Sequence, residues 1–317
     1  MSQPVITVTL NPAIDFTVTL PALRPGEVNL ASGGASNAGG KGVNVASCLA
    51  DWGAPVIATG LLGKHNSESF EALFRDKGIA DRFIRVGGDT RVNIKLADSA
   101  GGGTTDINLP GLSIEERHWD KLLTVLAADT NPDSLIVLAG SLPNGLPTDS
   151  YARLTGKLRQ WGARVVLDTS GPALSAALAA PREALPHCIK PNRQELAQWV
   201  GKPLADTAEV LTTARQLQAA GVAQVVVSLG EDGALFVLDT GPALLARLPV
   251  QNPVSTVGAG DALVAGLCAG LRQNLSPERC SRLAVAFASA KLAAIGPHLP
   301  SPDTVQALAD SVHIETL

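Results

Sequence analysis

Several residue types are scarce in this chain of 317 residues, and each scarcity excludes a class of protein. Aromatic residues make up only 3% of the chain, which disfavours a protein that binds single-stranded nucleic acid by stacking bases on aromatic rings. Positive charge is not in excess, because 25 Lys and Arg residues stand against 29 Asp and Glu residues, a net charge of −4. A general nucleic-acid-binding domain is normally basic, so this class is excluded as well.

The cysteines, the histidines and the apolar runs exclude further classes. No two of the 4 cysteines have the C-x-x-C spacing and none stands near a histidine in a zinc-ligand pattern, so we expect reduced structural thiols. No run of about 20 apolar residues is free of charge, which argues against a membrane span. Residues 1–5 lack the basic segment and the apolar stretch of a signal peptide. The sequence therefore predicts a cytoplasmic globular protein.

The order of apolar runs along the chain predicts an α/β fold. Short apolar runs at 134–139, 164–168, 187–190 and 224–229 read as strands, and segments with helical periodicity separate them. Strands that alternate with helices indicate βαβ units and a mostly parallel sheet. Residues 5–10 add a further buried strand. Helices are expected at 43–50, 151–161, 172–179, 207–220, 258–273, 277–295 and 302–312.

A small β excursion interrupts this pattern. Runs at 82–86, 91–97 and 104–109 are short and separated by glycine-rich turns, which indicates antiparallel strands. Apolar and polar residues also alternate at 14–20. No linker rich in Pro, Ser or charge divides the chain, so we expect one domain over residues 1–317 with a β lid drawn from about 14–31 and 82–109.

The most informative segment covers residues 255–266, where a loop with two glycines leads into an apolar helix. Backbone N–H groups converge at such a helix start, and the positive end of the helix dipole binds phosphate oxygens there. Asp261 lies in the first turn, where a carboxylate can accept the proton of a hydroxyl that attacks a phosphoryl group. The same carboxylate could merely complement the helix dipole, and the segment alone leaves both interpretations open.

Residues 33–42 are dense in glycine and are expected to form a loop, and a second informative segment covers residues 39–46. Its small residues permit close backbone approach, and Lys41 and Asn44 offer donors to a hydroxylated or phosphorylated ligand. It is not a Walker A loop, because Ala35 and Gly42 stand where that motif has Gly and Ser or Thr. Taken alone, the segment would be interpreted as an ordinary glycine-rich loop with a solvated Lys41.

The spacing of these segments resembles a known family. The first signature of the phosphofructokinase-B branch of ribokinase-like sugar kinases is matched by Gly39, Gly40, Asn44, Ala46, Gly53 and Gly63. Residues 258–261 resemble the second signature of that family. Further similar motifs lie at 10–15, 90–95, 140–143, 190–195 and 227–233, and the segments that most resemble the 1-phosphofructokinase branch are 26–30, 62–64 and 105–108. Ser255 departs from ribokinases and adenosine kinases, which usually have an acidic residue there, and is similar to the phosphosugar-kinase branch.

The resemblance implies a ribokinase-like three-layer α/β/α domain with a mostly parallel sheet and a small β-sheet lid. It implies ATP and Mg²⁺ as cofactors, a phosphosugar as the acceptor and a homodimer formed through the lid. Neither nucleic acid nor a membrane is expected as a partner. Within the family, the branch resemblance implies a kinase that converts fructose 1-phosphate to fructose 1,6-bisphosphate.

The resemblance also implies roles for individual residues. Asp261 would be the catalytic base, and the transferring phosphoryl group would lie at the amides of Gly258, Ala259 and Gly260. Glu195 would help to hold Mg²⁺ through bound water. The nucleotide would contact Asn192, Ser228, Gly230, Gly233 and Ser255. The sugar phosphate would contact Asp15, Gly39, Gly40, Lys41, Asn44, Arg91, Asn93, Lys95 and Ser141.

Charge favours an acceptor that already carries a phosphate. Arg91, Asn93 and Lys95 alternate along an expected strand and therefore share one face, although such a face can also be simply solvated. Together with Lys41 they would concentrate positive charge, which a phosphate compensates through charge-assisted hydrogen bonds. Asp168 ends an apolar strand, where an aspartate can equally well cap a helix, and is left out of the predicted site.

Two alternatives to this function remain. Within the same family, a tagatose-6-phosphate kinase or a 6-phosphofructokinase would have a similar sequence. A protein of the same fold that binds a sugar or a nucleotide without catalysis is disfavoured because Asp261 and the glycine-rich helix start are both present.

Overall fold

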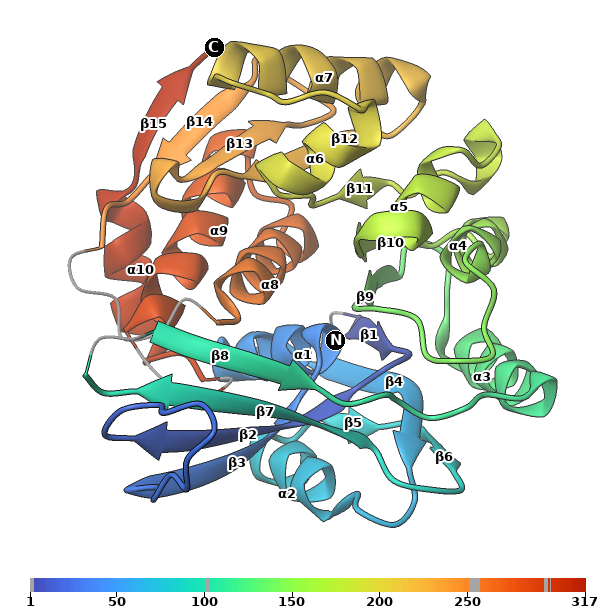
Figure 1. Ribbon diagram of the computed structural model, residues 1–317. Helices are drawn as coiled ribbons and strands as arrows, with labels where there is room; N and C mark the ends of the chain where they lie inside the picture. The colour runs from blue at the N-terminus through green and yellow to red at the C-terminus, as the bar shows by residue number, and fades with distance from the viewer. Residues whose placement is uncertain (1–2, 101–102, 251–256, 294–295, 297) are drawn as a thin grey trace.

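A long central sheet runs through the molecule, and most of its strands are parallel (Figure 1). The computed structural model describes residues 3–100, 103–250, 257–293, 296 and 298–317. Within these residues the strand order is β15-β14-β13-β12-β11-β10-β9-β1-β4-β5, with β6 beside β4. The strands are β1 (Val5–Thr9), β4 (Val56–Gly63), β5 (Ala80–Asp81), β6 (Ile84–Val86), β9 (Leu135–Ala139), β10 (Arg164–Asp168), β11 (Cys188–Ile189), β12 (Gln224–Ser228), β13 (Ala234–Val237), β14 (Leu244–Arg247) and β15 (His313–Thr316).

Helices cover both faces of this sheet, which is why the central strands β1 and β9 are buried along their whole length. One face is covered by α1 (Lys41–Asp51), α2 (Glu68–Lys77), α8 (Ala259–Arg272), α9 (Pro277–Leu292) and α10 (Pro302–Ser311). The other face is covered by α3 (Glu116–Asp129), α4 (Ser150–Gln160), α5 (Gly171–Leu178), α6 (Arg193–Val200) and α7 (Thr207–Ala220). The predicted three-layer α/β/α fold is confirmed.

A second, smaller sheet forms the lid, and in Figure 1 it lies below the main sheet. Its order is β3-β2-β7-β8, with antiparallel pairs at both edges and a parallel pair between β2 and β7 in the middle. Asp15 lies opposite Asn93 in that parallel pair, so their side chains share one face. The strands of the lid are β2 (Ala13–Leu20), β3 (Gly33–Gly39), β7 (Arg91–Asp98) and β8 (Gly103–Asn108).

Two sequence-based expectations about the lid differ from the structure. Residues 82–86 do not extend the lid, because β6 pairs in parallel with β4 and buries Val86 in the core under α3. Residues 33–39 form β3 rather than a loop. Glycine and alanine dominate this strand, so it has no alternation of large apolar and polar residues that would reveal it.

No helix among the described residues is long and apolar enough to cross a membrane. The four cysteines, Cys48, Cys188, Cys268 and Cys280, are buried and form no disulfide.

Candidate active site

The predicted site residues gather at the carboxyl ends of the parallel strands, where ligands commonly bind to open α/β sheets. Asn11, after β1, donates through Nδ2 to Oγ of Ser141, after β9, at 3.0 Å. Asn192, after β11, forms an isolated β-bridge with Ser228 at the end of β12. Residues from four segments of the sheet therefore line one of its edges, and the starts of α1 and α8 face them.

Asp261 lies in the first turn of α8 and is almost completely buried, with 7% of its surface exposed. Nδ2 of Asn44 donates to its Oδ2 at 2.8 Å and fixes the carboxylate. Burial, followed by the charge of Asp168, raises the pKa of Asp261 to about 6, although Lys41, Asn44 and Lys190 oppose the shift. A carboxylate with this raised pKa is a competent proton acceptor near neutral pH.

Glycine is required at the start of α8. The helix begins after Gly258, whose φ of 81° lies in the left-handed region that glycine adopts without strain. A methyl group added at Gly258 would lie 3.3 Å from Cε of Lys291, and one added at Gly260 would lie 3.4 Å from Nζ of Lys190. The backbone N–H groups of this turn lie at the positive end of the helix dipole, and the buried side chains of Lys190 and Lys291 lie beside the turn.

An ion cluster around Asp168 connects the two glycine-rich segments. Oδ1 of Asp168, a side chain with no exposed surface, lies 3.0 Å from Nζ of Lys41 and 3.4 Å from Nζ of Lys190. Burial alone would lower the pKa of Lys41, but Asp168 and Asp261 raise it above its usual value. The sequence-based site omits Asp168 and Lys190. Both residues lie at the ends of apolar strands, and Lys190 also opens the motif at 190–195, but neither signal shows that the two side chains meet.

The face of the lid that carries Asp15 supplies the residues expected to bind the sugar. Nδ2 of Asn93 donates to Oδ1 of Asp15 at 3.0 Å. Gly39 is the last residue of β3, and a methyl group there would lie 2.5 Å from Oδ2 of Asp15. Gly40, with a φ of 112°, then turns the chain into α1, which carries Lys41 and Asn44. The structure thus brings the first signature and the lid residues to one place.

The three predicted cations differ in their surroundings. Lys41 is paired with Asp168, and Lys95 is paired with Asp106 across the lid at 3.1 Å, so neither concentrates unbalanced charge as the sequence suggests. Arg91 is different. Its Nη2 lies 3.5 Å from the carbonyl oxygen of Asn11, and its buried Nε has no partner among the described residues. Burial lowers the pKa of Arg91, with Asp15 opposing, so this guanidinium lacks the compensation that a phosphate would provide.

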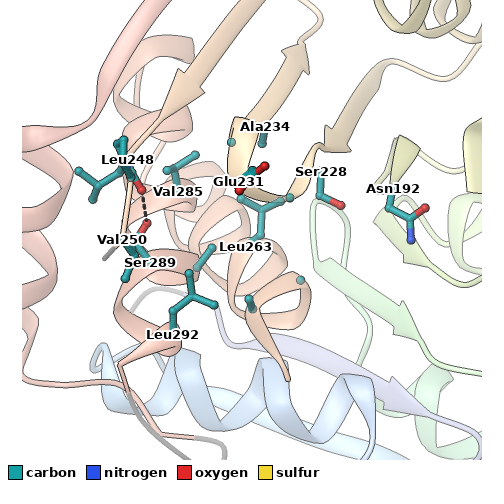
Figure 2. Close-up of a pocket in the computed structure, with 16 residues that line it drawn as sticks. Asn192, Ser228, Glu231, Ala234, Leu248, Val250, Leu263, Val285, Ser289 and Leu292 are labelled. Atoms are coloured by element: carbon teal, nitrogen blue, oxygen red, sulfur yellow. Dashed lines mark hydrogen bonds between the residues drawn. The ribbon is translucent and has the colours of Figure 1, made fainter. Parts of the chain in front are cut away.

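A pocket with a volume of about 780 Å³ opens on the other side of Gly260 and carries the predicted nucleotide residues (Figure 2). Asn192 and Ser228 lie at one end, and apolar side chains such as Leu248 and Leu292 form the opposite wall. Gly233 must be glycine, because its φ is 87° and a side chain would meet the carbonyl of Ala246. The size and the mixed lining suit a purine nucleotide. Ser255 lies outside the described residues.

Asn192 and Glu195 form a capping box at the start of α6. Glu195 Oε2 accepts from the backbone N–H of Asn192, and Oδ1 of Asn192 accepts from the backbone N–H of Glu195, both at 2.8 Å. Within the part of the chain that the structure describes, no group of three His, Cys, Asp or Glu residues could hold a metal ion. Mg²⁺ is commonly held by one or two carboxylates together with water and substrate phosphates, so a single Glu195 fits that ion as a partner of bound nucleotide.

The fold and this site define a sugar kinase of the ribokinase-like type. The chain belongs to the pfkB family of carbohydrate kinases, whose pattern matches residues 4–304. It is 49% identical over 315 residues to the 1-phosphofructokinase of Xanthomonas campestris pv. campestris, with 99% of each chain covered. It is 43% identical over 321 residues to the 1-phosphofructokinase of Rhodobacter capsulatus, which covers 100% of this chain and 99% of the relative.

Solved structures agree with this assignment. The phosphofructokinase-2 from Escherichia coli in complex with substrates and products superposes with a TM-score of 0.89 at 29% identity, over 97% of this chain and 99% of that one. The protein is therefore an ATP-dependent phosphotransferase that acts on a carbohydrate.

Proposed function

We propose that the protein transfers the terminal phosphoryl group of ATP to the 6-hydroxyl of fructose 1-phosphate, which gives fructose 1,6-bisphosphate and ADP. The observation that carries this proposal is the buried Asp261, held by Asn44 at the start of α8 between the nucleotide pocket and the polar face of the lid. Full-length relatives that carry the name 1-phosphofructokinase support the choice of acceptor.

In the proposed reaction, Asp261 accepts the proton of the 6-hydroxyl as the hydroxyl oxygen bonds to the γ-phosphorus. The bond between this phosphorus and the β–γ bridging oxygen breaks, and its electron pair leaves with ADP. Negative charge on the transferred group is compensated by the N–H groups of residues 258–260 and by the ammonium of Lys190. The buried carboxylate then loses its proton to solvent when the products leave.

The other end of the acceptor would lie on the polar face of the lid. Arg91 is the cation of this face that we assign to the 1-phosphate, because its buried Nε has no partner among the described residues. Asp15 and Asn93 would bind sugar hydroxyls, as would Ser141 beyond β9. This arrangement keeps the existing phosphate and the base at opposite ends of the sugar.

The adenine and ribose would occupy the 780 Å³ pocket, with Gly230 and Gly233 against the nucleotide. Mg²⁺ bound to ATP would neutralise part of the charge of the phosphates. Glu195 is the carboxylate that would hold this ion through water, and its Oε2 accepts from the backbone N–H of Asn192.

We also propose that the enzyme is a cytoplasmic homodimer formed through the lid. Large apolar side chains are exposed at Phe16 and Ile107, and Val28 and Leu30 are 90% and 81% exposed in the turn between β2 and β3. An exposed apolar sheet of this kind is commonly covered by a partner. Four unpaired, buried cysteines suit a reducing compartment.

A panel of phosphorylated ketohexoses tests the substrate. The purified protein is assayed for ADP release with ATP, Mg²⁺ and fructose 1-phosphate, fructose 6-phosphate or tagatose 6-phosphate, and we expect the highest kcat/KM with fructose 1-phosphate. Fructose 6-phosphate is the main competitor, because the phosphofructokinase-2 of Escherichia coli in complex with fructose-6-phosphate superposes with a TM-score of 0.88. A higher kcat/KM with either 6-phosphate would show that the named acceptor is wrong.

A further inference from the structure

Asp168 connects the acceptor side and the nucleotide side of the site through a single oxygen atom. Lys41 is the first residue of α1 and lies two residues after Gly39, which packs against Asp15 of the lid. Lys190 follows β11 and comes two residues before Asn192 of the nucleotide pocket. Oδ1 of Asp168 lies within 3.0 Å of the first ammonium and 3.4 Å of the second.

A structural role as a helix cap does not account for this carboxylate. The N-cap of α5 is Ser170, and no side chain there bonds the helix backbone. The second oxygen of Asp168, Oδ2, is buried and has no partner among the described residues. A fully buried carboxylate is costly unless its interactions compensate the lost hydration, so the two lysines are the interactions that retain it.

We propose that Asp168 is a positioning residue for phosphoryl transfer, which holds the ammonium groups of Lys41 and Lys190 on the acceptor side and the nucleotide side of the group being transferred. The geometry supports this role because Nζ of Lys190 also lies beside Gly260, where the transferring group would meet the start of α8. The proposal rests on the proposed function in that it assigns the phosphoryl group to this helix start.

The same carboxylate acts on the base. The charged or titratable groups that face Asp261 are Lys41 and Cys48 on α1, Asp168 on β10, Lys190 after β11 and Lys291 on α9. Among these, Asp168 raises the pKa of Asp261, whereas Lys41 and Lys190 lower it. Loss of the charge at Asp168 would therefore lower the pKa of Asp261 and leave the ammonium groups of Lys41 and Lys190 without their common partner.

Replacement of the carboxylate by an amide of similar size tests the proposal. In Asp168→Asn we expect kcat to fall by about 100-fold, because misplaced charged groups lose the geometry of transfer. We expect the KM values for ATP and for the sugar phosphate to change by less than about threefold. The acid limb of the profile of kcat/KM against pH should move to lower pH relative to wild type. Titration of the substrate phosphate is common to both proteins and cancels in this comparison.

The matched control is Asp51→Asn, which removes a different carboxylate that pairs with a lysine and is 20% exposed. Asp51 lies 2.6 Å from Nζ of Lys77 and accepts from the backbone of Leu299, outside the site. Asp51→Asn should keep the kcat and the acid limb of wild type. A folded Asp168→Asn with kcat within about threefold of wild type, or with an unmoved acid limb, would overturn the proposal.

A second variant tests the cluster if Asp168→Asn does not fold. Lys41 is 36% exposed, so Lys41→Met removes one held cation with less disturbance of the core. The acid limb of the kcat/KM profile of Lys41→Met should move to higher pH, because Lys41 lowers the pKa of Asp261. An acid limb at the wild-type position would overturn the proposal. The turnover of wild type is measured in the same assay. A wild-type protein without kinase activity would contradict the proposed function, whereas an active wild type lets the variants test the role of Asp168.

Discussion

As the proposed base, Asp261 is a residue at which catalysis and stability make opposite demands. Burial and Asp168 raise its pKa to about 6, above the usual value of 3.8. The protonated form therefore stabilises the fold at low pH, and this stabilisation is lost as the pH rises through about 6. A base must nevertheless be deprotonated to act, so the proposed reaction would take place in the pH range in which the buried charge costs stability.

We expect Asp261→Asn to lower kcat by about 10²–10⁴-fold, the usual contribution of a general base. The same variant should melt at a higher temperature than wild type at pH 8, because the amide cannot ionise, and the two proteins should converge below about pH 4. Steady-state kinetics and calorimetry at both pH values measure the two effects. Near-wild-type turnover in a folded Asp261→Asn would falsify the assignment of the base.

Arg91 should determine the affinity for the phosphate of the acceptor. A hydrogen bond to a charged group contributes about 1.5–3 kcal/mol, so Arg91→Met should raise the KM for the sugar phosphate by about 10–100-fold. The KM for ATP should stay within about twofold of wild type, because the nucleotide pocket is lined by other residues.

Lys95→Met is the control for Arg91, because Lys95 already pairs with Asp106 on the same face of the lid. It should raise the KM for the sugar phosphate by much less than Arg91→Met does. Equal effects of the two variants would contradict the assignment of the phosphate to Arg91.

Gly39, the last residue of β3, leaves the space that the carboxylate of Asp15 occupies. In Gly39→Ala the new methyl group would lie 2.5 Å from Oδ2 of Asp15, so this carboxylate must move. We expect the KM for the sugar phosphate to rise by about tenfold or more, with the KM for ATP unchanged. Gly33→Ala, on the same strand, is the control, because no atom lies within 4 Å of the added group. A KM for the sugar phosphate that is equal in the two variants would show that Asp15 does not bind the acceptor.

Elements with strong periodicity could be predicted from the sequence, and weakly patterned ones could not. The helix expected at 207–220 is α7 (Thr207–Ala220), and the one expected at 151–161 is α4, shifted by a single residue. The strand β3 was missed because its small residues show no periodicity, and β6 was placed in the wrong sheet because its partner is set by tertiary contacts.

The same limit applies to the site. Asp15, Asn44 and Asp261 could be indicated because each lies in a short motif whose residues are close together in the sequence. The structure brings these three residues to one edge of the sheet. The role of Asp168 depends on Lys41, which is 127 residues away, and no local pattern reveals an ion pair over that distance.

At the scale of the whole molecule, the lid should decide the oligomeric state. Phe16 and Ile107 are 39% and 45% exposed on the apolar face of the lid, whereas Thr104 lies on the opposite face, with Asp106. Light scattering should give a dimer for wild type at micromolar concentrations and a monomer for the double variant F16E/I107E, because charges would be buried in the interface.

Thr104→Glu provides the control for the dimer, because it adds a charge to the face that carries Asp106, and it should leave the dimer intact. A wild-type protein that is monomeric and fully active would contradict a dimer through the lid.

The central position of β1 has a consequence for synthesis of the chain on the ribosome. β1 emerges first but lies between β4 and β9, and α1 packs against α8, which begins only at Ala259. A nascent chain that ends before β9 leaves one edge of β1 unpaired, and one that ends before α8 leaves the apolar surface of α1 uncovered. Unpaired edges and exposed apolar surface promote aggregation. Chains truncated upstream of α8 should therefore depend on chaperones, because most of the protein must be made before its first strand and first helix are fully covered.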